Sequence, residues 1–363
     1  SLKSLLEGIL RTVPQSLFRK VIFLSKRIDE KSLQVKVQKT IKTNNLIENN
    51  DKIVLAVSGG PDSLCMLDLL NKFKNSKKIN FEIIVAHVNH MIREEADSDE
   101  EFVKQFCQER KIEFISKKVD VKKISQEKKI GLEEAGREER YKFFDEILAK
   151  KRFNKIAIAH NKNDVAETMF MNLFRGTGIS GLKGIEAKSG KYIRPLIEID
   201  RSEIEKYCTE NELKPRIDKT NFENEYTRNK IRNIVIPYIQ KEFNPNIIET
   251  MFRLSELVQD EEKFMKNHTE KIYTEIRIFE DLKDKKQIKL DLKKFNAQSK
   301  VIKSKIIIYT ITRLIGNSKG IEKVHIEDIL KLCDRNIGNK FLTPNKNLKI
   351  LIKNGQINFE SKL

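Results

Sequence analysis

The sequence predicts an α/β protein with a doubly wound parallel sheet, followed by a mainly helical C-terminal domain. Two observations support the sheet. Short apolar runs typical of buried strands alternate with helical patterns between residues 53 and 174. The first run, Ile53–Val57, leads directly into a Gly-rich turn and a helix. A third observation, mostly helical Lys- and Glu-rich patterns after Asn244, indicates the second domain.

The expected elements follow in chain order. A helix is expected from Lys36 to Asn45, before the first strand. Further strands are expected at Phe81–Val88, Ile112–Val119 and Lys155–His160, with a short edge strand at Tyr192–Leu196. The intervening helices are Glu94–Arg110, Leu132–Lys150, Asn163–Phe174 and Arg201–Asn211. A polar loop at 218–226 precedes a helix, Thr227–Gln240, interrupted at Pro237. Long helices follow at 246–280 and 300–315, and Asn354-Gly355 joins a terminal hairpin of Leu348–Ile352 and Gln356–Glu360. The expected domains are a helical extension (1–37), the sheet domain (38–240) and the C-terminal domain (241–363).

The turn after the first strand predicts a phosphate-binding site. It reads Ser58-Gly59-Gly60-Pro61-Asp62-Ser63. Glycines allow the backbone to approach a ligand, and Pro61 suits a first helical turn. Backbone N–H groups and the helix dipole then favour an anion. The Lys-Ser/Thr pair of a Walker loop is missing, and an ordinary strand–turn–helix corner is the alternative.

The charge balance favours a polyanionic partner. There are 71 Lys and Arg against 53 Asp and Glu, a net charge of +18. Nucleic acid is the usual partner of such a chain, although a Lys- and Asn-rich proteome would give the same bias. The four cysteines, 65, 107, 208 and 333, form no C-x-x-C pair, which disfavours a zinc ribbon or redox motif. Free thiols and the absence of a signal peptide or long apolar run predict a cytoplasmic protein without membrane contact.

A second cluster begins where the fourth strand ends. Asp164, Glu167 and Thr168 have i, i+3, i+4 spacing and share a helical face. Carboxylates there could hold Mg²⁺, which prefers oxygen ligands and bridges to phosphates. Helix capping by Asn163 or Asp164 is the alternative, and it leaves Glu167 unexplained.

Arginine pairs suggest further anion contacts. Arg137 and Arg140 share one helical face, as do Arg228 and Arg232 at i, i+4. Either pair could bind phosphate or RNA backbone, or simply form a solvated surface. Gly176 to Gly181 matches G-x-G-x-x-G but follows a helix, so a dinucleotide site is disfavoured.

Together these blocks resemble the tRNA(Ile)-lysidine synthetases, members of the PP-loop ATP pyrophosphatases, over roughly residues 38 to 355. The S-G-G-x-D-S motif at Ser58–Ser63 is common to all PP-loop enzymes. The more specific matches are H-x-N-H-x-x-R at His87–Arg93, R-E-E-R-Y at Arg137–Tyr141, H-N-x-x-D-x-A-E-T at His160–Thr168, R-G-T-G-I-S-G-L at Arg175–Leu182, R-P-L at Arg194–Leu196, and D-x-T-N with R-N-x-x-R within Asp218–Arg232.

The resemblance implies ATP-dependent attachment of free L-lysine to C2 of the wobble cytidine in isoleucine tRNA with a CAU anticodon. It implies an adenylated cytidine intermediate, with ATP and Mg²⁺ as cofactors. Asp62, Arg137, Asp164 and Arg228 are expected to be catalytic, with Asp62 and Asp164 holding the metal. The expected ATP-binding residues are Ser58, Gly59, Gly60, Pro61, Asp62, Ser63 and His87. The expected lysine- or tRNA-binding residues are His160, Glu167, Asn221 and Arg232.

This chain departs from the family pattern at two positions and in its length. The family usually carries an acidic residue at position 163 and often a histidine at 161, where this chain has asparagines. Longer members have a further C-terminal module. A PP-loop tRNA thiolase and a small-molecule amide-forming synthetase are the alternatives, and the missing cysteine pairs disfavour the thiolase. The oligomeric state stays open, with a homodimer among the options.

Overall fold

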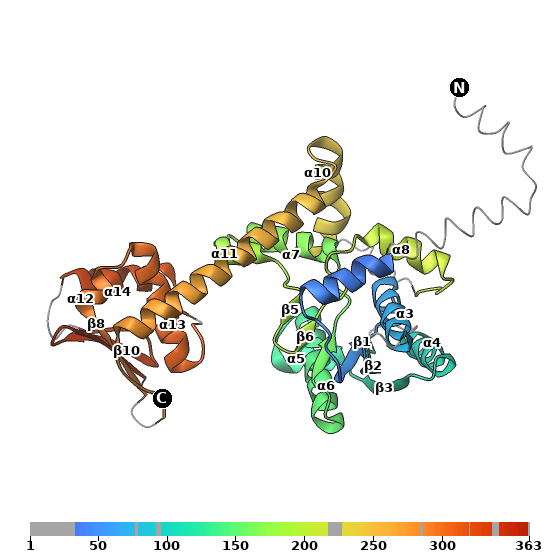
Figure 1. Ribbon diagram of the computed structural model, residues 1–363, viewed down its shortest axis with the longest axis horizontal. Coiled ribbons are helices and arrows are strands. Elements are labelled where there is room, and N and C mark those ends of the chain that lie inside the picture. The colour runs from blue at the N-terminus through green and yellow to red at the C-terminus, as the bar shows by residue number, and fades with distance from the viewer. Residues whose placement is uncertain are drawn as a thin grey trace, which may run out of the picture. The chain divides into compact units, whose positions relative to one another are not determined.

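The computed structural model describes residues 33–76, 79–91, 96–216, 227–283, 286–318, 320–335 and 341–361. The chain forms two compact units, Ser1–Val258 and Gln259–Leu363, and each is described by itself (Figure 1). The division between the units falls within helix α11 (Ile247–Ile276), and the domain boundary expected after residue 240 stays a prediction. Most of the predicted N-terminal extension lies outside the described residues. Residues 33–43 form the expected helix.

The first unit contains a six-stranded sheet in the order β3-β2-β1-β4-β6-β5. Its strands are β1 (Asp51–Ala56), β2 (Phe81–Asn89), β3 (Glu113–Lys118), β4 (Lys155–Ala157), β5 (Lys188–Ser189) and β6 (Tyr192–Ile193). Among the described strands of this sheet β5 alone pairs antiparallel, so the predicted doubly wound parallel sheet is confirmed. The chain leaves β3 at one edge and returns in β4 beside β1. That reversal is the position at which such sheets bind ligands.

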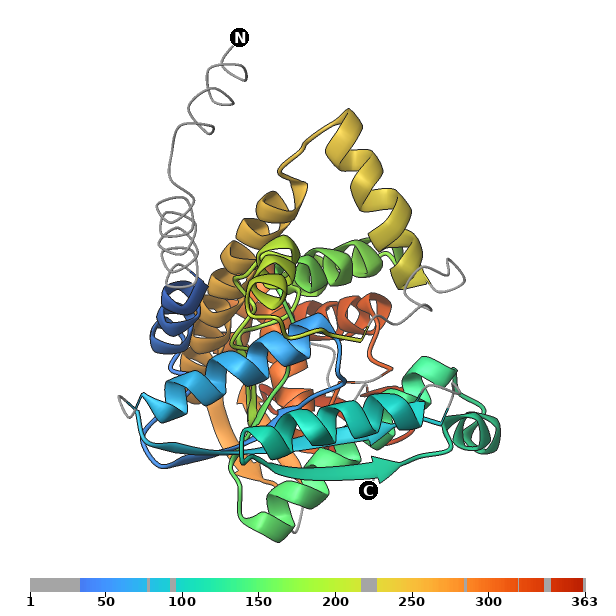
Figure 2. The same ribbon diagram turned by 90° about the vertical axis from the view of Figure 1, so that its right-hand side faces the viewer.

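Apolar alternation along the central strands separates two helical layers. Ile53 and Leu55 face one core with α3 (Pro61–Asn75), α4 (Ala96–Glu109) and α8 (Arg201–Glu210). Val54 and Ile84 face the other core with α6 (Leu132–Lys151). In Figure 2, α3 lies above this sheet and α6 below it. Because strand side chains alternate between faces, a continuous apolar run buries both sides of β1.

A cluster of helices flanks the carboxyl edge of the sheet. Helix α7 (Lys162–Phe174) packs with residues from three further helical segments in one apolar core. These segments are the π-helix η3 (Ile231–Val235), helix α10 (Ile236–Glu242) and the start of α11. The other segments of this unit are α5 (Val121–Lys128), the 3₁₀ helix η1 (Ile179–Lys183) and α9 (Thr227–Lys230).

Three local predictions were wrong. The strand at Tyr192–Ile193 lies between β4 and β5 rather than at the sheet edge. The predicted interruption at Pro237 is instead the π-helix just before it, because proline is tolerated in the first turn of α10. The N-cap of α7 is Asn161 rather than Asn163, and Asp164 takes part in capping only as the third helical residue of the capping box.

The second unit holds a five-stranded antiparallel sheet in the order β7-β8-β11-β10-β9. Its predicted hairpin is confirmed, and Asn354 and Gly355 have the positive φ angles, 53° and 69°, of a tight hairpin turn. The other three strands were not predicted, so this region is less helical than expected. The strands are β7 (Arg277–Asp281), β8 (Gln287–Asp291), β9 (Phe341–Asn345), β10 (Leu348–Lys353) and β11 (Gln356–Ser361), and the helices are α12 (Leu292–Asn296), α13 (Lys300–Ile315) and α14 (Lys323–Arg335).

No helix within the described ranges combines the length and the apolar character needed to cross a membrane.

Candidate active site

A cleft of about 680 Å³ opens at the carboxyl ends of β1, β2 and β4. Its walls bring together blocks of sequence from the whole first unit. Ten of the predicted site residues line it: Ser58, Gly60, Asp62, Ser63, His87, Arg137, His160, Asp164, Arg228 and Arg232. Gly59, Pro61 and Glu167 do not line the cleft, and Asn221 falls outside the described residues.

Hydrogen bonds of a serine hydroxyl within the Ser58 loop fix the conformation of its backbone. The Oγ of Ser63 accepts from the backbone N–H groups of Ser58 and Gly59, both at 3.2 Å, and donates to the carbonyl of Gly60 at 2.9 Å. Gly59 has φ of 92°, which favours glycine, and a Cβ there would lie 3.2 Å from Val103. The helix begins with no side chain capping it at Gly60. The N-terminus of α3 therefore fits an anionic ligand.

His87 is a neutral imidazole at the end of β2. Its Nδ1 lies 2.8 Å from the carbonyl oxygen of Val57, so Nδ1 carries the proton and donates. Burial lowers the pKa of His87. The other ring nitrogen, Nε2, is consequently an acceptor, suited to a ribose hydroxyl or an adenine amino group.

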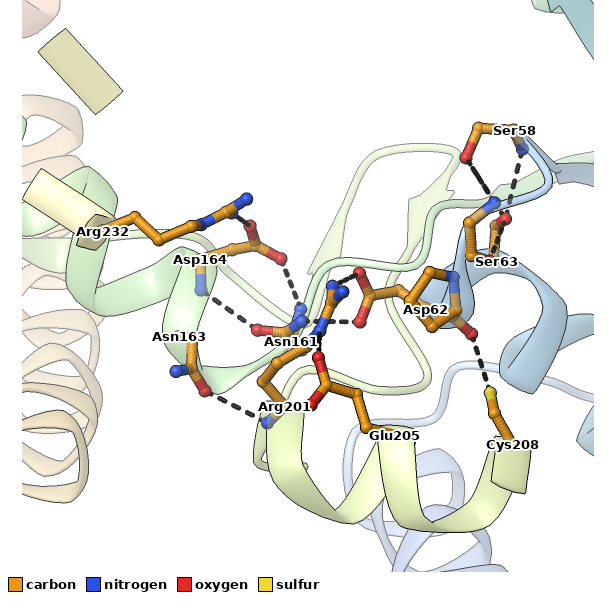
Figure 3. Close-up of polar contacts among 12 residues, drawn as sticks. Ser58, Asp62, Ser63, Asn161, Asn163, Asp164, Arg201, Glu205, Cys208 and Arg232 are labelled. Atoms are coloured by element: carbon orange, nitrogen blue, oxygen red, sulfur yellow. Dashed lines mark hydrogen bonds and ion pairs between the residues drawn. The ribbon is translucent and has the colours of Figure 1, made fainter. Parts of the chain in front are cut away.

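The carboxylate of Asp62 is fixed by two donors, which Figure 3 shows. Asn161 Nδ2 donates to its Oδ1 at 2.9 Å, and Arg201 Nη1 forms an ion pair with its Oδ2. Burial raises the pKa of Asp62 to about 6, the charge of Arg201 acts against this rise, and the nearby charge of Asp164 adds to it. The negative charge here is incompletely compensated, so the site favours an additional cation.

Asp164 and Glu167 are bonded to the two arginines of α9 and η3. Arg228 donates to Glu167 at 2.8 Å and to Asp164 at 2.7 Å. Arg232 donates to the two oxygens of Glu167 at 2.6 and 2.9 Å. Glu167 is only 1% exposed, so this pairing compensates a buried charge. The carboxylates predicted to bind lysine and metal and the arginines predicted to bind phosphate thus contact each other directly.

The side chain of Asp164 also caps the start of α7. It forms a capping box with Asn161, accepting from the backbone N–H of Asn161 at 2.9 Å, while Asn161 Oδ1 accepts from the Asp164 N–H at 3.2 Å. This box satisfies N–H groups at the start of α7. Asn163 instead accepts from the N–H of Arg201 at 3.1 Å. An asparagine there keeps the acceptor that a carboxylate would supply and loses only its charge.

His160 is also neutral. Arg194 Nε donates to its Nδ1 at 3.1 Å, which leaves the proton on Nε2. Burial, together with the charges of Arg194, Arg228, Arg137 and Arg140, lowers the pKa of His160 to about 3. His160 is therefore a hydrogen-bond donor to the cleft rather than a proton acceptor at neutral pH.

Arg137 and Arg140 supply positive charge to the part of the cleft wall that α6 forms. Both are exposed and line the cleft from α6. Arg137 lies over the ring of Tyr141 at 5.0 Å, and none of the residues in the described part of the chain forms an ion pair with it. Arg140 Nη2 lies 3.3 Å from His90 Nε2. A guanidinium that no carboxylate compensates is well suited to an anionic ligand.

The residues fit Mg²⁺ best at Asp62. Within the described ranges no group of three or more His, Cys, Asp or Glu side chains could hold a metal by itself. Mg²⁺ does not need one, since one or two carboxylates together with nucleotide phosphates suffice. Asp164 accepts from Asn161, Arg228 and Arg232 and lies next to two cations, whereas Asp62 has one donor on each oxygen. Asp62 is the stronger of the two predicted ligands.

Some residues of this network were not predicted. Arg201 and Asn161 hold Asp62, and Arg194 sets the tautomer of His160. Asn161 and Arg194 lie inside the quoted sequence blocks. Arg201 follows the R-P-L block, but its contact with Asp62 spans 139 residues and no local pattern indicates it.

Comparison with known proteins identifies the family. A family model described as a PP-loop domain matches residues 30–239. The tRNA(Ile)-lysidine synthase of Clostridium acetobutylicum is 46% identical over 320 residues, which cover 88% of this chain and 68% of that protein. The tRNA(Ile)-lysidine synthase of Clostridioides difficile is 41% identical, with 89% of this chain and 69% of that protein covered. The chain therefore spans about two thirds of the length of these relatives.

A solved structure confirms the fold of the first unit. The U34-tRNA thiolase NcsA from Methanococcus maripaludis, solved with its [4Fe-4S] cluster, aligns with a TM-score of 0.55 and 24% identity. The alignment covers 64% of this chain and 80% of the thiolase. At that identity the likeness shows the fold alone. With the PP-loop domain, its cleft and the relatives named above in agreement, this chain belongs to the tRNA(Ile)-lysidine synthases, ligases of the PP-loop family.

Proposed function

We propose that this chain forms lysidine in two steps within the cleft. The C2 oxygen of the wobble cytidine in isoleucine tRNA attacks the α-phosphate of ATP, and pyrophosphate leaves. The ε-amine of free lysine then attacks C2 of the adenylated base and displaces AMP. The single observation that best supports this is the cleft itself, which combines a phosphate-binding loop with arginines and carboxylates.

The Ser58 loop would bind the β- and γ-phosphates that leave as pyrophosphate. The N-terminus of α3, which no side chain caps at Gly60, favours their charge. Asp62, with Asp164 beside it, would hold Mg²⁺, which offsets phosphate charge when bound. His87, as a neutral acceptor, would contact the nucleoside part of ATP.

Arg137 would offset the charge that develops at the α-phosphate. It is exposed to the cleft and free of ion pairs with the described residues, so its charge is available. Arg228 faces the same cleft, although two carboxylates share its charge. We therefore assign Arg228 to orienting the substrate and Arg137 to balancing the adenylate.

The lysine would bind near Asp164. That carboxylate lines the cleft and could accept from the lysine ammonium group, with the Nε2–H of His160 as a neighbouring donor. Glu167 does not line the cleft, so it would act through Arg228 and Arg232. Arg232 would contact tRNA backbone. The role of Asn221 in substrate binding stays a prediction.

The tRNA must present an unstacked wobble base, because the reacting C2 atom is inaccessible within a stacked anticodon. The net charge of +18 favours such a partner, and the Lys-rich second unit would add backbone contacts. Both proposed substrates, ATP and tRNA, meet in the cytoplasm, which we propose as the site of reaction. A homodimer stays an open prediction.

The most direct experiment measures which products are released from ATP. Incubation with α-labelled ATP, lysine and an isoleucine tRNA transcript with a CAU anticodon should yield AMP and pyrophosphate only when tRNA is present. A transcript with uridine at the wobble position is the matched control, because it lacks the reacting cytidine. Release of ADP, or of AMP without tRNA, would contradict the proposal.

The chemistry of the cysteines disfavours the thiolase alternative. All four cysteines are free and buried, and they are spread over both units. Burial raises the pKa of Cys107 and Cys333 to about 12, so both stay thiols. No cluster-binding set is present in the described part of the chain. The structure therefore favours the ligase reaction.

A further inference from the structure

The most informative contact outside the predicted site is the one between Arg201 and Asp62. Arg201 is the first residue of α8, and Asp62 lies in the first turn of α3. The Nη1 of Arg201 forms an ion pair with Oδ2 of Asp62, while Asn161 donates to Oδ1. Figure 3 shows the two donors reaching the same carboxylate. Neither Arg201 nor Asn161 lines the cleft, whereas Asp62 does.

We propose that Arg201 and Asn161 are positioning residues that fix the carboxylate of Asp62 from behind the cleft. This inference deepens the proposed function and rests on it for its kinetic test. Two donors, one on each oxygen, set the plane of the carboxylate, and each oxygen keeps a lone pair for a ligand in the cleft.

Arg201 is itself held in place. Its Nε donates to Glu205 at 2.7 Å, and its backbone N–H donates to Asn163 at 3.1 Å. Glu205 therefore holds the guanidinium at Nε, and Asn163 holds the backbone from which the side chain extends. A side chain held in this way loses little entropy on forming the contact, which favours one geometry for the carboxylate.

Stabilising α8 does not require the contact with Asp62. The helix has its own capping box from Asp200 and Glu203. The i, i+4 pair with Glu205 uses a different nitrogen of Arg201. The bond from Nη1 to Asp62 is additional, and it connects α8 to the phosphate-binding loop.

Electrostatics explains why a cation is needed at this place. Asp62 and Asp164 approach each other across Asn161, which contacts both of them. Two carboxylates close together repel, so Asp62 would turn away from α7 without a compensating charge. Arg201 supplies that charge from outside the cleft and leaves the cleft side of Asp62 open.

The kinetic test compares Arg201→Met, Arg201→Lys and Lys206→Met. Lys206 lies on the same helix and pairs with Glu210 at 3.9 Å, so K206M is a control for the loss of one i, i+4 pair. We expect R201M to lower kcat for tRNA-dependent AMP release by about tenfold or more, without raising the KM for lysine beyond about twofold. R201K should recover to within about threefold, because it restores the charge but not the fork. Wild-type kcat in R201M would overturn the proposal, as would an equal loss in K206M.

A second pair of variants covers the case in which R201M folds poorly. Asn161→Ser keeps an oxygen that can cap α7 but removes the amide group that donates to Asp62. Asn161→Asp also keeps the cap and adds a negative charge beside Asp62. We expect kcat to fall in the order wild type, N161S, N161D at unchanged melting temperature for N161S. Equal activity of all three would contradict the proposed role.

Hydrogen exchange separates this inference from the proposed function. Positioning predicts faster exchange at residues 58–64 in R201M than in wild type, and no change in K206M, whether or not lysidine is formed. Unchanged exchange there would overturn the positioning role. A wild-type protein that releases no AMP with tRNA would instead refute the proposed function alone.

Discussion

The Nε of Arg228 lies 2.8 Å from Oε2 of Glu167, a carboxylate with only 1% of its surface exposed. Burial lowers the pKa of Arg228, but the charges of Asp164 and Glu167 outweigh this and raise it above its usual value. With Arg232 these residues form a group of two cations and two anions at the edge of the cleft. Each member depends on the others for charge compensation, because an unpaired buried charge is costly.

Arg228→Ala should therefore impair both stability and catalysis. The variant leaves Glu167 with Arg232 as its remaining partner, so we expect the free energy of unfolding to fall by about 1–3 kcal/mol. We expect kcat for AMP formation to fall by about tenfold to a hundredfold, since Arg228 lines the cleft. Urea denaturation and initial-rate measurements check the two effects. An Arg228→Ala variant with near-native AMP formation would remove this residue from the mechanism.

Asp62→Asn should separate activity from stability. Burial raises the pKa of Asp62 to about 6, so its charged form is disfavoured in the folded protein. A group with a raised folded pKa contributes stability that is lost as the pH rises through that value. At pH 8 the neutral Asn should thus give a free energy of unfolding equal to or above that of wild type, and the difference should shrink at pH 5. AMP formation should fall by about a hundredfold or more. A large loss of stability at pH 8 would contradict this account.

His160 should make the protein sensitive to acid. Its folded pKa of about 3 lies below the unfolded value near 6.5, so the unfolded chain binds the extra proton between these values. The contribution of His160 is present above about pH 6.5 and is lost as the pH falls toward 3, with a slope of up to about 1.4 kcal/mol per pH unit.

Denaturation of wild type and His160→Gln across this range isolates the effect, because glutamine keeps an acceptor for Arg194 and cannot gain the proton. The exposed His268 supplies the control, since His268→Gln leaves the contacts of His160 intact. Parallel pH profiles for wild type and His160→Gln would show that the imidazole is not buried as described.

Binding of tRNA should weaken steeply with salt. The net charge of +18 implies that Lys and Arg contacts to phosphates release counterions. We expect affinity for the transcript to fall at least about tenfold between 50 and 200 mM salt, more steeply than the affinity for ATP alone. Filter binding or fluorescence titration at several salt concentrations gives both slopes. Equal slopes for tRNA and ATP would argue against an extended contact with RNA backbone.

Features that depend on local sequence were predictable. Ile53–Val57, the glycines after it and the apolar spacing of the next helix are contiguous, so strand, turn and helix can be read together. The hairpin at Asn354-Gly355 is predictable in the same way. Its two turn residues both have positive φ angles, and Asn and Gly are among the few residues that adopt them. Family resemblance extended this to the blocks that line the cleft.

Long-range pairings were not predictable. The ion pair of Arg201 with Asp62 depends on how α8 packs against α3, and no pattern near either residue encodes it. The pairing of Arg228 with Glu167 was likewise hidden, since each side chain taken alone suits a ligand. The strand at Phe341–Asn345 contains Pro344, which disfavours a strand assignment but is tolerated at a sheet edge, where β9 lies.

In the proposed reaction the phosphate-binding loop activates a tRNA base for attack by lysine. Incorporation of radiolabelled lysine into the isoleucine transcript tests it most directly, with ATP omitted, or the wobble cytidine replaced by uridine, as matched controls. We expect label to enter tRNA only with ATP and the cytidine transcript, with one AMP released for each lysine incorporated. AMP release with no label in the tRNA, or label that is independent of the wobble base, would contradict it.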